Sequence, residues 1–359
     1  MLLGKKKGLL GLDIGSSSVK AVELQQTKKG YQLKHFRILP LPPEAIVDGA
    51  IMNSSAVVDA VSELISMEKI KTKEVATSIS GHSVIIKKIK LPQMTEEELE
   101  ESIQWEAEQY IPFDITDVNL DVQILGSDEQ NVGQMEVLLV AAKKDIINDH
   151  MAILMEAGLN PQVMDVDAFA IENMFEANYG VKEGETVVLA NIGANIININ
   201  ILKNGVSTFT RDISMGGSQF TEEIQKQLNV SHEEAESLKL GGDLGGHSET
   251  TEAVIPQEVG SIIRSVSETM AVEIQRSLDF FAATAADDKI STIYLMGGSS
   301  KVPGLPNVIA SKLGITTEIA DAFRSIQINE RSFDMAHIRE VSPTAAVAVG
   351  LSMRYVGDK

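Results

Sequence analysis

The chain has 359 residues, of which 43% are hydrophobic, and it carries a formal net charge of −20. That length allows two or more domains, and the hydrophobic content excludes global disorder. The negative charge argues against DNA or RNA as a partner and against direct binding to bare anionic lipid. There are no cysteines, so disulfides and thiolate chemistry are excluded.

Nothing in the sequence predicts insertion into a membrane. No apolar run reaches the length of a transmembrane helix, and residues 1–12 lack the long apolar segment and cleavage site of a secretory signal. Lys5-Lys6-Lys7 is the one candidate basic patch, and we interpret it as a solvated tail. The short polar C-terminus, residues 352–359, has no amphipathic anchor. These features predict a cytoplasmic protein.

The first structural signal is a strand, a glycine–serine turn and a second strand. Residues 8–12 are apolar, Asp13-Ile14-Gly15-Ser16-Ser17-Ser18 follows, and residues 19–24 alternate as a strand does. The turn offers backbone N–H groups that a phosphate can approach. Asp13 could face a divalent cation through water. A single turn of this kind is more often purely structural.

The next stretch contains a helix and the elements of a small module. A strand at 31–39 ends at prolines, Asn53 caps an amphipathic helix, and a strand at 74–80 stops at Gly81. Thr95 and Glu98 form a capping box for a helix that runs to about Tyr110 and carries Trp105, the only tryptophan. The other predicted elements of 82–159, an α+β module, are strands at 84–91, 118–125 and 135–142 and a helix at 146–157.

The second half repeats the opening pattern. Asp165 is expected to begin a helix that ends near Gly180. A strand at 186–190, a turn at Asn191-Ile192-Gly193-Ala194 and a strand at 196–202 then repeat the first hairpin, which suggests two domains of related design.

Glycine pairs and helices follow this second hairpin. Gly216-Gly217 precedes a predicted helix at 218–228, and residues 241–251 are expected to be a mobile loop. A strand at 289–296 ends in Gly297-Gly298-Ser299. The remaining predicted helices span 232–240, about 256–283, 306–313 and 343–354.

Three strands therefore end in phosphate-sized turns, at Gly15, Gly193 and Gly297. Together they suggest that two domains share one nucleotide. The sequence contains neither a Walker A loop nor a Rossmann fingerprint, which excludes the two commonest alternatives.

The order of these motifs resembles the actin-like ATPases, which include actin, FtsA, sugar kinases and the ATPase domains of heat-shock chaperones. Within that superfamily the chain is most similar to the PilM family of type IV pilus proteins. The similarity is carried by residues 11–24, by Leu91-Pro92 with the Trp-Glu-Ala-Glu-Gln-Tyr-Ile-Pro-Phe stretch at 105–113, and by residues 165–170.

The resemblance implies an α/β actin-like fold with two related domains around a nucleotide cleft. Subdomain 1A would comprise 1–81, completed by 160–185 and 341–359, and an FtsA-like subdomain 1C would comprise 82–159. Subdomain 2A would comprise 186–215, completed by 286–340, and subdomain 2B would comprise 216–285.

The resemblance also implies that ATP and Mg²⁺ are the cofactors. Asp13 would hold the magnesium water shell, and Lys20 would contact phosphate. Asn191 and Gly216-Gly217 are further candidates, and Asp165 matches the first position of the connect 1 motif. The implied contacts are phosphate on Gly15, Ser16, Ser17, Ser18, Gly193 and Ala194, ribose on Glu236 and Lys239, and adenosine on Gly297, Gly298 and Ser299.

Family resemblance further implies an adaptor role in the pilus assembly platform and in twitching motility. PilM-like proteins bind the N-terminal cytoplasmic tail of the membrane protein PilN between 1A and 1C, and couple it to motor ATPases. The protein would then be peripheral to the inner membrane through its partner. The expected groove residues are Val84, Ile86, Lys88, Trp105 and Tyr110, although a lone helical tryptophan is more often core.

Several alternatives stay open at this stage. Asn191 stands where the superfamily usually has aspartate, so hydrolysis is expected to be weak or absent. Asp165 could be the hydrolytic base or simply a helix N-cap. An actin-fold kinase of a small metabolite and an FtsA-like filament protein are the competing functions.

Overall fold

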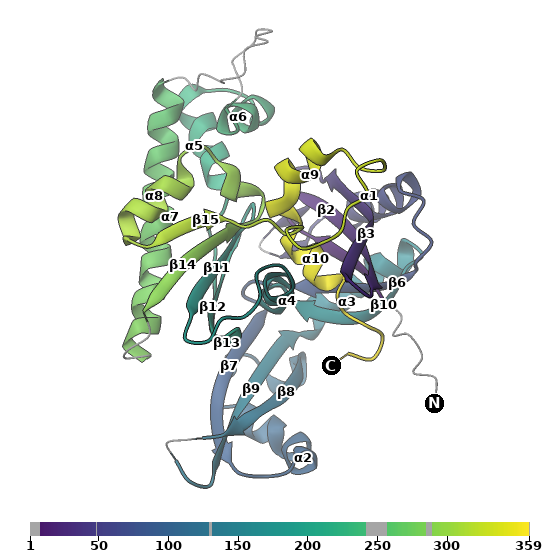
Figure 1. Ribbon diagram of the computed structural model, residues 1–359, viewed down its shortest axis with the longest axis vertical. Coiled ribbons are helices and arrows are strands. Elements are labelled where there is room, and N and C mark those ends of the chain that lie inside the picture. The colour runs from purple at the N-terminus through teal and green to yellow at the C-terminus, as the bar shows by residue number, and fades with distance from the viewer. Residues whose placement is uncertain (1–7, 48, 129–130, 242–256, 285–288, 359) are drawn as a thin grey trace.

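The computed structural model describes residues 8–47, 49–128, 131–241, 257–284 and 289–358 (Figure 1). Two five-stranded sheets and one three-stranded sheet organise these residues. The expected mobile loop at 241–251 lies outside the described residues apart from Gly241. Among the described residues, no helix is both long and apolar enough to cross a membrane.

The first sheet is a meander extended by two parallel strands, in the order β10-β6-β1-β2-β3. β1 and β2 pair antiparallel with Asp13 opposite Lys20, because a tight turn joins them. β6 and β10 add on in parallel at the other side of β1. The strands are β1 (Leu10–Ile14), β2 (Ser18–Thr27), β3 (Gly30–Pro40), β6 (Glu74–Ile79) and β10 (Asn160–Val166).

The second sheet repeats this arrangement, in the order β13-β12-β11-β14-β15. β11 and β12 pair antiparallel with Asn191 opposite Asn198, and β14 and β15 are parallel to β11. The repeat of strand order supports the predicted pair of related domains. The strands are β11 (Thr186–Ile192), β12 (Ile197–Lys203), β13 (Val206–Ile213), β14 (Ile290–Met296) and β15 (Thr316–Ile319).

Helices cover both sheets, and one helix lies between them. α1 (Ser54–Met67) buries its apolar stripe against one face of the first sheet. α4 (Asp167–Tyr179) packs against the facing surfaces of both sheets, so it joins the two halves in one hydrophobic core (Figure 1). The outer face of the second sheet is covered by α5 (Ser218–Leu228), α6 (His232–Lys239), α7 (Gln257–Thr284) and α8 (Leu305–Leu313).

The C-terminal segment from Met335 to Leu351 is not one helix, and the helix predicted at 343–354 is shorter than expected. The segment divides into α9 (Met335–Val341), a 3-10 turn at Ser342–Ala345 and α10 (Ala346–Leu351). Pro343 lies in the first turn of the 3-10 segment, where its missing N–H is tolerated. A Cβ on Gly350 would overlap the carbonyl oxygen of Ala170, so the contact between α10 and α4 requires glycine.

The three-stranded sheet has the order β7-β9-β8 and forms the lower lobe in Figure 1. Its elements are β7 (Val84–Pro92), α2 (Glu96–Ala107), a 3-10 turn at Ile115–Asp117, β8 (Val118–Ser127), β9 (Gln134–Lys143) and α3 (Lys144–Glu156). The capping box of Thr95 and Glu98 is present, as predicted. The helix ends at Ala107 rather than near Tyr110.

The sequence pattern missed several short elements and one strand. Asp165 was expected to begin a helix, whereas it lies near the end of the unpredicted strand β10, and α4 begins only at Asp167. β15 and α9 were not predicted because they are short and lack clear periodicity. A two-stranded hairpin of β4 (Ile46–Val47) and β5 (Ala50–Ile51) was also missed. The predicted subdomain boundaries stay a prediction.

Candidate nucleotide-binding site

The first hairpin holds a buried ion pair at its turn. The Nζ atom of Lys20 lies 3.0 Å from Oδ2 of Asp13, and both side chains are about nine-tenths buried. The Gly15 N–H donates to the Ser18 carbonyl at 3.1 Å and closes the turn. Lys20 also donates to that carbonyl at 3.3 Å. The pair therefore fixes one negative and one positive charge directly below the turn.

The second hairpin has the same backbone but a neutral pair. The Gly193 N–H donates to the Ile196 carbonyl at 2.9 Å. The Nδ2 atom of Asn191 donates to Oδ1 of Asn198 at 2.8 Å, between residues that face each other across the strands. Asn198 in turn donates to Oδ1 of Asp212 at 2.9 Å. The carboxylate of this half therefore lies on β13 and not at the turn.

Three glycine segments of the second half meet at one place. Gly217 N–H and Ser299 Oγ both donate to the Gly193 carbonyl, each at 2.9 Å. A Cβ on Gly216 would overlap the Ala194 carbonyl, and Gly297 has a φ of +86°. The structure thus brings the second-half phosphate turn, Gly193 and Ala194, together with the Gly297–Ser299 turn predicted to contact adenosine.

The residues predicted to face the ribose lie beside this cluster. Lys239 is buried, and its Nζ atom donates to Oε1 of Glu236 at 2.6 Å and to the Gly217 carbonyl at 3.4 Å. Thr221 Oγ1 accepts a third bond from Lys239 at 3.0 Å and donates to Glu236. α6 is therefore joined to the start of α5 by a charged network.

Asp167, which the sequence interpretation passed over, lies at the first hairpin. Its Oδ1 accepts a hydrogen bond from Ser78 Oγ at 2.6 Å. Burial first, and the nearby Asp13 carboxylate second, raise the pKa of Asp167 to about 7. It is therefore a carboxyl group poised to exchange a proton near neutral pH.

Asp165 is not the N-cap of α4, one of the two roles predicted for it. It lies in β10, and the residue at the N-cap of α4 is Val166. The carboxylate of Asp165 accepts from Arg354 Nε at 2.7 Å and from the Val166 N–H at 2.8 Å. The signal that could have found Asp167 is the second acid of Asp165-Val166-Asp167. Asp167 stands three residues before Ala170, just as Asp165 stands three residues before Ala168.

Polar contacts link the two halves next to the hairpins. The Gly81 N–H, on the first half, donates to Oδ2 of Asp212 at 2.5 Å. His82 Nε2 lies 2.5 Å from Ser214 Oγ. Burial raises the pKa of Asp212, and Asp212 also lies close enough to Asp167 to raise its pKa. We call Asp13, Asp167, Asp212, Asn198 and Asn191 the polar chain, because it runs from one hairpin to the other.

A family profile described as "Type IV pilus assembly protein PilM" matches residues 11–356. The chain belongs to the PilM family. A chain in a solved "PilM-PilN type IV pilus biogenesis complex" is 29% identical to this PilM-family protein, covers 98% of it and 100% of its own length, and has a TM-score of 0.85.

Two more distant proteins are also similar, and the second, a solved structure, shares the actin-like ATPase fold. The cell division protein FtsA of Bacillus subtilis (strain 168) is 24% identical over 205 residues, which is 52% of this chain and 45% of FtsA. The chain thus matches less than half of that curated relative. MreB5 of Spiroplasma citri bound to ADP is 13% identical, with 96% and 94% of the two chains covered and a TM-score of 0.50.

The residues predicted for the peptide groove are divided between two sides of the three-stranded sheet in this PilM-family protein. Val84 and Ile86 point to one face of the three-stranded sheet and pack with residues of α3, β10 and α4. Tyr110 packs in the core on the opposite face, under α2. Lys88 is paired with Glu136 at 2.5 Å. Alternation along β7 separates these residues between the two faces of the sheet, so a peptide groove that they share stays a prediction.

Trp105 is not a core residue, and it does not lie on the face of the sheet that carries Val84 and Ile86. It projects from the outer side of α2, and 76% of its surface is exposed. We call the surface around Val84, Ile86, Val140, Ile146 and Met164 the peptide face, because Val84 and Ile86 are two of the residues predicted to bind a peptide.

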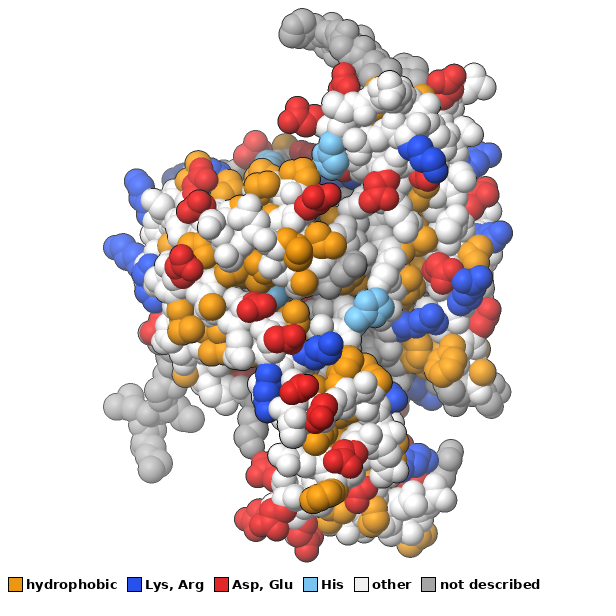
Figure 2. All heavy atoms as spheres, turned by 180° about the vertical axis from the view of Figure 1, so that it is seen from behind, with side chains coloured by type: hydrophobic (Ala, Val, Ile, Leu, Met, Phe, Trp, Pro, Cys, Tyr) orange, Lys and Arg blue, Asp and Glu red, His pale blue; other side chains and the backbone are white. Residues whose placement is uncertain are grey.

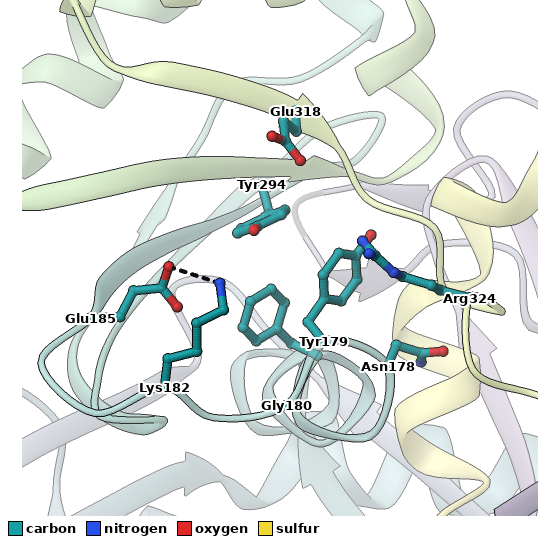
Figure 3. A pocket seen from close by; sticks show the side chains of 9 residues that line it. Asn178, Tyr179, Gly180, Lys182, Glu185, Tyr294, Glu318 and Arg324 are labelled. Carbon is teal, nitrogen blue, oxygen red and sulfur yellow. Dashed lines mark hydrogen bonds and ion pairs between the residues drawn. The ribbon is translucent and has the colours of Figure 1, made fainter.

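A pocket lies where the chain passes between the halves (Figure 3). Its volume is about 280 Å³, and its floor is an aromatic cluster in which Phe175 and Tyr179 stack with centroids 4.9 Å apart. Tyr294 and the side chains of Glu185 and Glu318 form one side, and the Arg324 guanidinium lies 4.8 Å from the centre of the Tyr179 ring. None of the site residues predicted from the sequence lines this pocket.

The described part of the chain contains no metal site formed by the protein alone. No group of three or more His, Cys, Asp or Glu side chains there could hold a metal ion. Asp13 would thus meet a cation only together with other ligands.

Proposed function

We propose that this PilM-family protein is an ATP-binding adaptor of the type IV pilus assembly platform at the inner membrane. It would bind Mg-ATP between its hairpins and the N-terminal cytoplasmic tail of a PilN-like protein on the peptide face. The observation that supports this most directly is the convergence of the glycine turns in a chain whose fold matches the solved PilM-PilN complex.

Both hairpin turns fit a phosphate ligand. In the described residues, the backbone N–H groups of Ser16 and Ser17 have no hydrogen-bond partner, and neither do those of Ala194 and Asn195. Exposed donors at paired turns favour an anion between them. Lys20 would add the positive charge, and Asp13 would orient the water shell of Mg²⁺.

The nucleoside would lie against the second half. Gly216, Gly217 and the Gly297–Ser299 turn present backbone without side-chain bulk, and Glu236 and Lys239 border them. ATP supplies a phosphoanhydride bond when it is bound there. Asp167, rather than Asp165, would orient or deprotonate the water, because its pKa of about 7 suits that role. We infer weak turnover, since Asn191 and Asn198 give the second hairpin no carboxylate.

The peptide face suits a short apolar segment with a polar flank. Val84, Ile86 and Ile146 are only partly buried there, so a peptide can still remove apolar surface from water. The Lys88–Glu136 pair follows along the same face and would contact polar groups of the tail. Through this tail, and through pilus motor ATPases, the protein would act at the membrane without entering it.

The test is calorimetry with a synthetic peptide of the PilN-like tail, using two matched variants. Ile86→Glu should weaken binding about 30-fold or more, because it places a carboxylate at the centre of the interface. Trp105→Ala, on the opposite side of the same module, should bind as the native protein does.

Thermal unfolding of each variant separates lost binding from lost folding. If Trp105→Ala loses the peptide while Ile86→Glu keeps it, the binding wall is α2 and the peptide face is wrong.

A further inference from the structure

The outer face of α2 is not explained by nucleotide binding or by the peptide face. α2 buries Leu99, Ile103 and Ala107 against the three-stranded sheet. On its other side the helical spacing aligns a stripe of exposed residues, namely Glu97, Glu101, Trp105 and Glu108. We call this stripe the α2 outer face.

The tryptophan is the unusual member of this face. A side chain of this size usually contributes to a core or an interface, and the only tryptophan of the chain is instead 76% exposed. The Trp-Glu-Ala-Glu-Gln-Tyr-Ile-Pro-Phe stretch therefore contributes side chains both to the core of the module and to its surface. Tyr110 and Ile111 pack inside the module, whereas Trp105 points away from it.

The chain segment that carries this face has charge of one sign. Between Gln93 and Ala142 the sequence contains no lysine, arginine or histidine, and every charged residue is Asp or Glu. Acidic side chains accordingly gather at the lower end of the molecule in Figure 2. Lys88 and Lys90 of β7 lie on the other face of the sheet and are paired with Glu136 and Asp128. On the α2 side, Lys143 lies over the Phe113 ring at 4.6 Å, and Lys87 is exposed.

We propose that the α2 outer face is a docking site for a Lys/Arg-rich segment of a partner protein. A Lys or Arg side chain can lie over the exposed indole, which is the ring that best attracts cations, while its neighbours meet the glutamates. The same charge repels nucleic acid, anionic lipid and a second copy of this chain at net charge −20. The site is independent of the proposed ATP and tail-peptide sites.

Because Trp105 is the only tryptophan, its fluorescence reports on this face alone. Oligolysine and oligoarginine peptides, titrated into the full-length protein, should change the emission saturably, with the larger response to arginine. Increasing ionic strength should reverse the change. An uncharged Gly-Ser peptide of equal length should have no effect.

Calorimetry on matched variants distinguishes a site from bulk charge. Glu97→Gln, Glu101→Gln and Glu108→Gln together should weaken peptide binding about tenfold. Glu222→Gln, Glu233→Gln and Glu258→Gln remove the same charge from exposed positions of the other half and should change it less than about twofold. Trp105→Ala alone should weaken binding by about threefold.

Three results would overturn the proposal. Equal losses in the two triple variants would mean that net charge alone attracts the peptides. Concentration-dependent sedimentation that Trp105→Ala abolishes would make the occupant a second copy of the chain. Emission that changes when residues 1–7 are deleted, with no peptide present, would make the occupant the chain's own lysines.

Discussion

The two hairpins have one backbone design and opposite electrostatics. Each has a glycine two residues after its key polar residue, and each closes with an N–H to carbonyl bond of 3.1 or 2.9 Å. Asp13 and Lys20 are a charged pair in the first, whereas Asn191 and Asn198 are a neutral amide pair at the equivalent places in the second.

The carboxylate associated with the second hairpin is that of Asp212, which lies away from the turn. Asn198 passes a hydrogen bond to Asp212 on β13, and Asp212 accepts the Gly81 N–H from the other half. The carboxylate of the second half thus lies at the contact between the halves and not at the turn. The first hairpin has its charges at the turn, whereas the carboxylate bonded to the second hairpin helps to hold the halves together.

The largest effect is expected from giving the first hairpin the neutral chemistry of the second. Asp13→Asn should leave Lys20 buried without its carboxylate, which costs about 3–5 kcal/mol of folding free energy. It should also reduce Mg-ATP affinity at least about 100-fold, since the magnesium shell loses its anion. Chemical denaturation and calorimetry measure the two effects.

A double variant separates these two effects. Asp13→Asn with Lys20→Asn copies the amide pair of the second hairpin and should recover most of the stability without recovering ATP affinity. ATP binding of native strength in the double variant would contradict the phosphate assignment of this turn.

A smaller effect is expected at Asp167, the acid beside the first hairpin. Its pKa is about 7 in the folded protein against an ordinary 3.8, so the folded state holds the proton more tightly. The protonated Asp167 therefore contributes fully to the free energy of unfolding below pH 4, and this contribution is lost as the pH rises to about 7. Asp167→Asn should remove this loss and stabilise the protein by about 2 kcal/mol at pH 8, while any ATP turnover falls by about tenfold or more.

Glu172 provides the matched control for Asp167. Burial raises its pKa to about 7 as well, but its hydrogen bonds go to Asn200 and Ser207, away from the hairpin turns. Glu172→Gln should remove a similar loss of stability at high pH, as Asp167→Asn does, but it should leave ATP turnover unchanged. If both variants lower turnover equally, Asp167 has no special role in hydrolysis.

The sequence predicted the two hairpins well because each is a local pattern. The spacing of Asp13, Gly15 and Lys20 recurs at Asn191 and Gly193, and hydrogen bonds within a few residues enforce it. The position of Asp167 depends instead on how β10 pairs with β6, which the sequence does not show. Asp165, two residues earlier, was therefore predicted in its place. The faces of β7 posed the same difficulty, since the side that meets α2 is set by tertiary packing.

The smallest effect is expected from returning a carboxylate to the second hairpin. Asn191→Asp removes the donor that Asn198 accepts, so Asn198 must turn its amide around and release Asp212. This should cost about 1–2 kcal/mol of folding free energy. Any ATP turnover should rise by several-fold, because the turn gains an acid that can orient water.

The exchange variant, Asn191→Asp with Asp212→Asn, keeps the net charge and moves the carboxylate back to the turn. Its amide on β13 can still accept from Gly81, and Asn198 can donate to the new carboxylate, so stability should return close to the native value. Phosphate release measures the turnover of this variant, and thermal unfolding measures its stability. If stability returns and turnover does not rise, the neutral hairpin is not what limits hydrolysis, and the difference between the hairpins concerns contact between the halves alone.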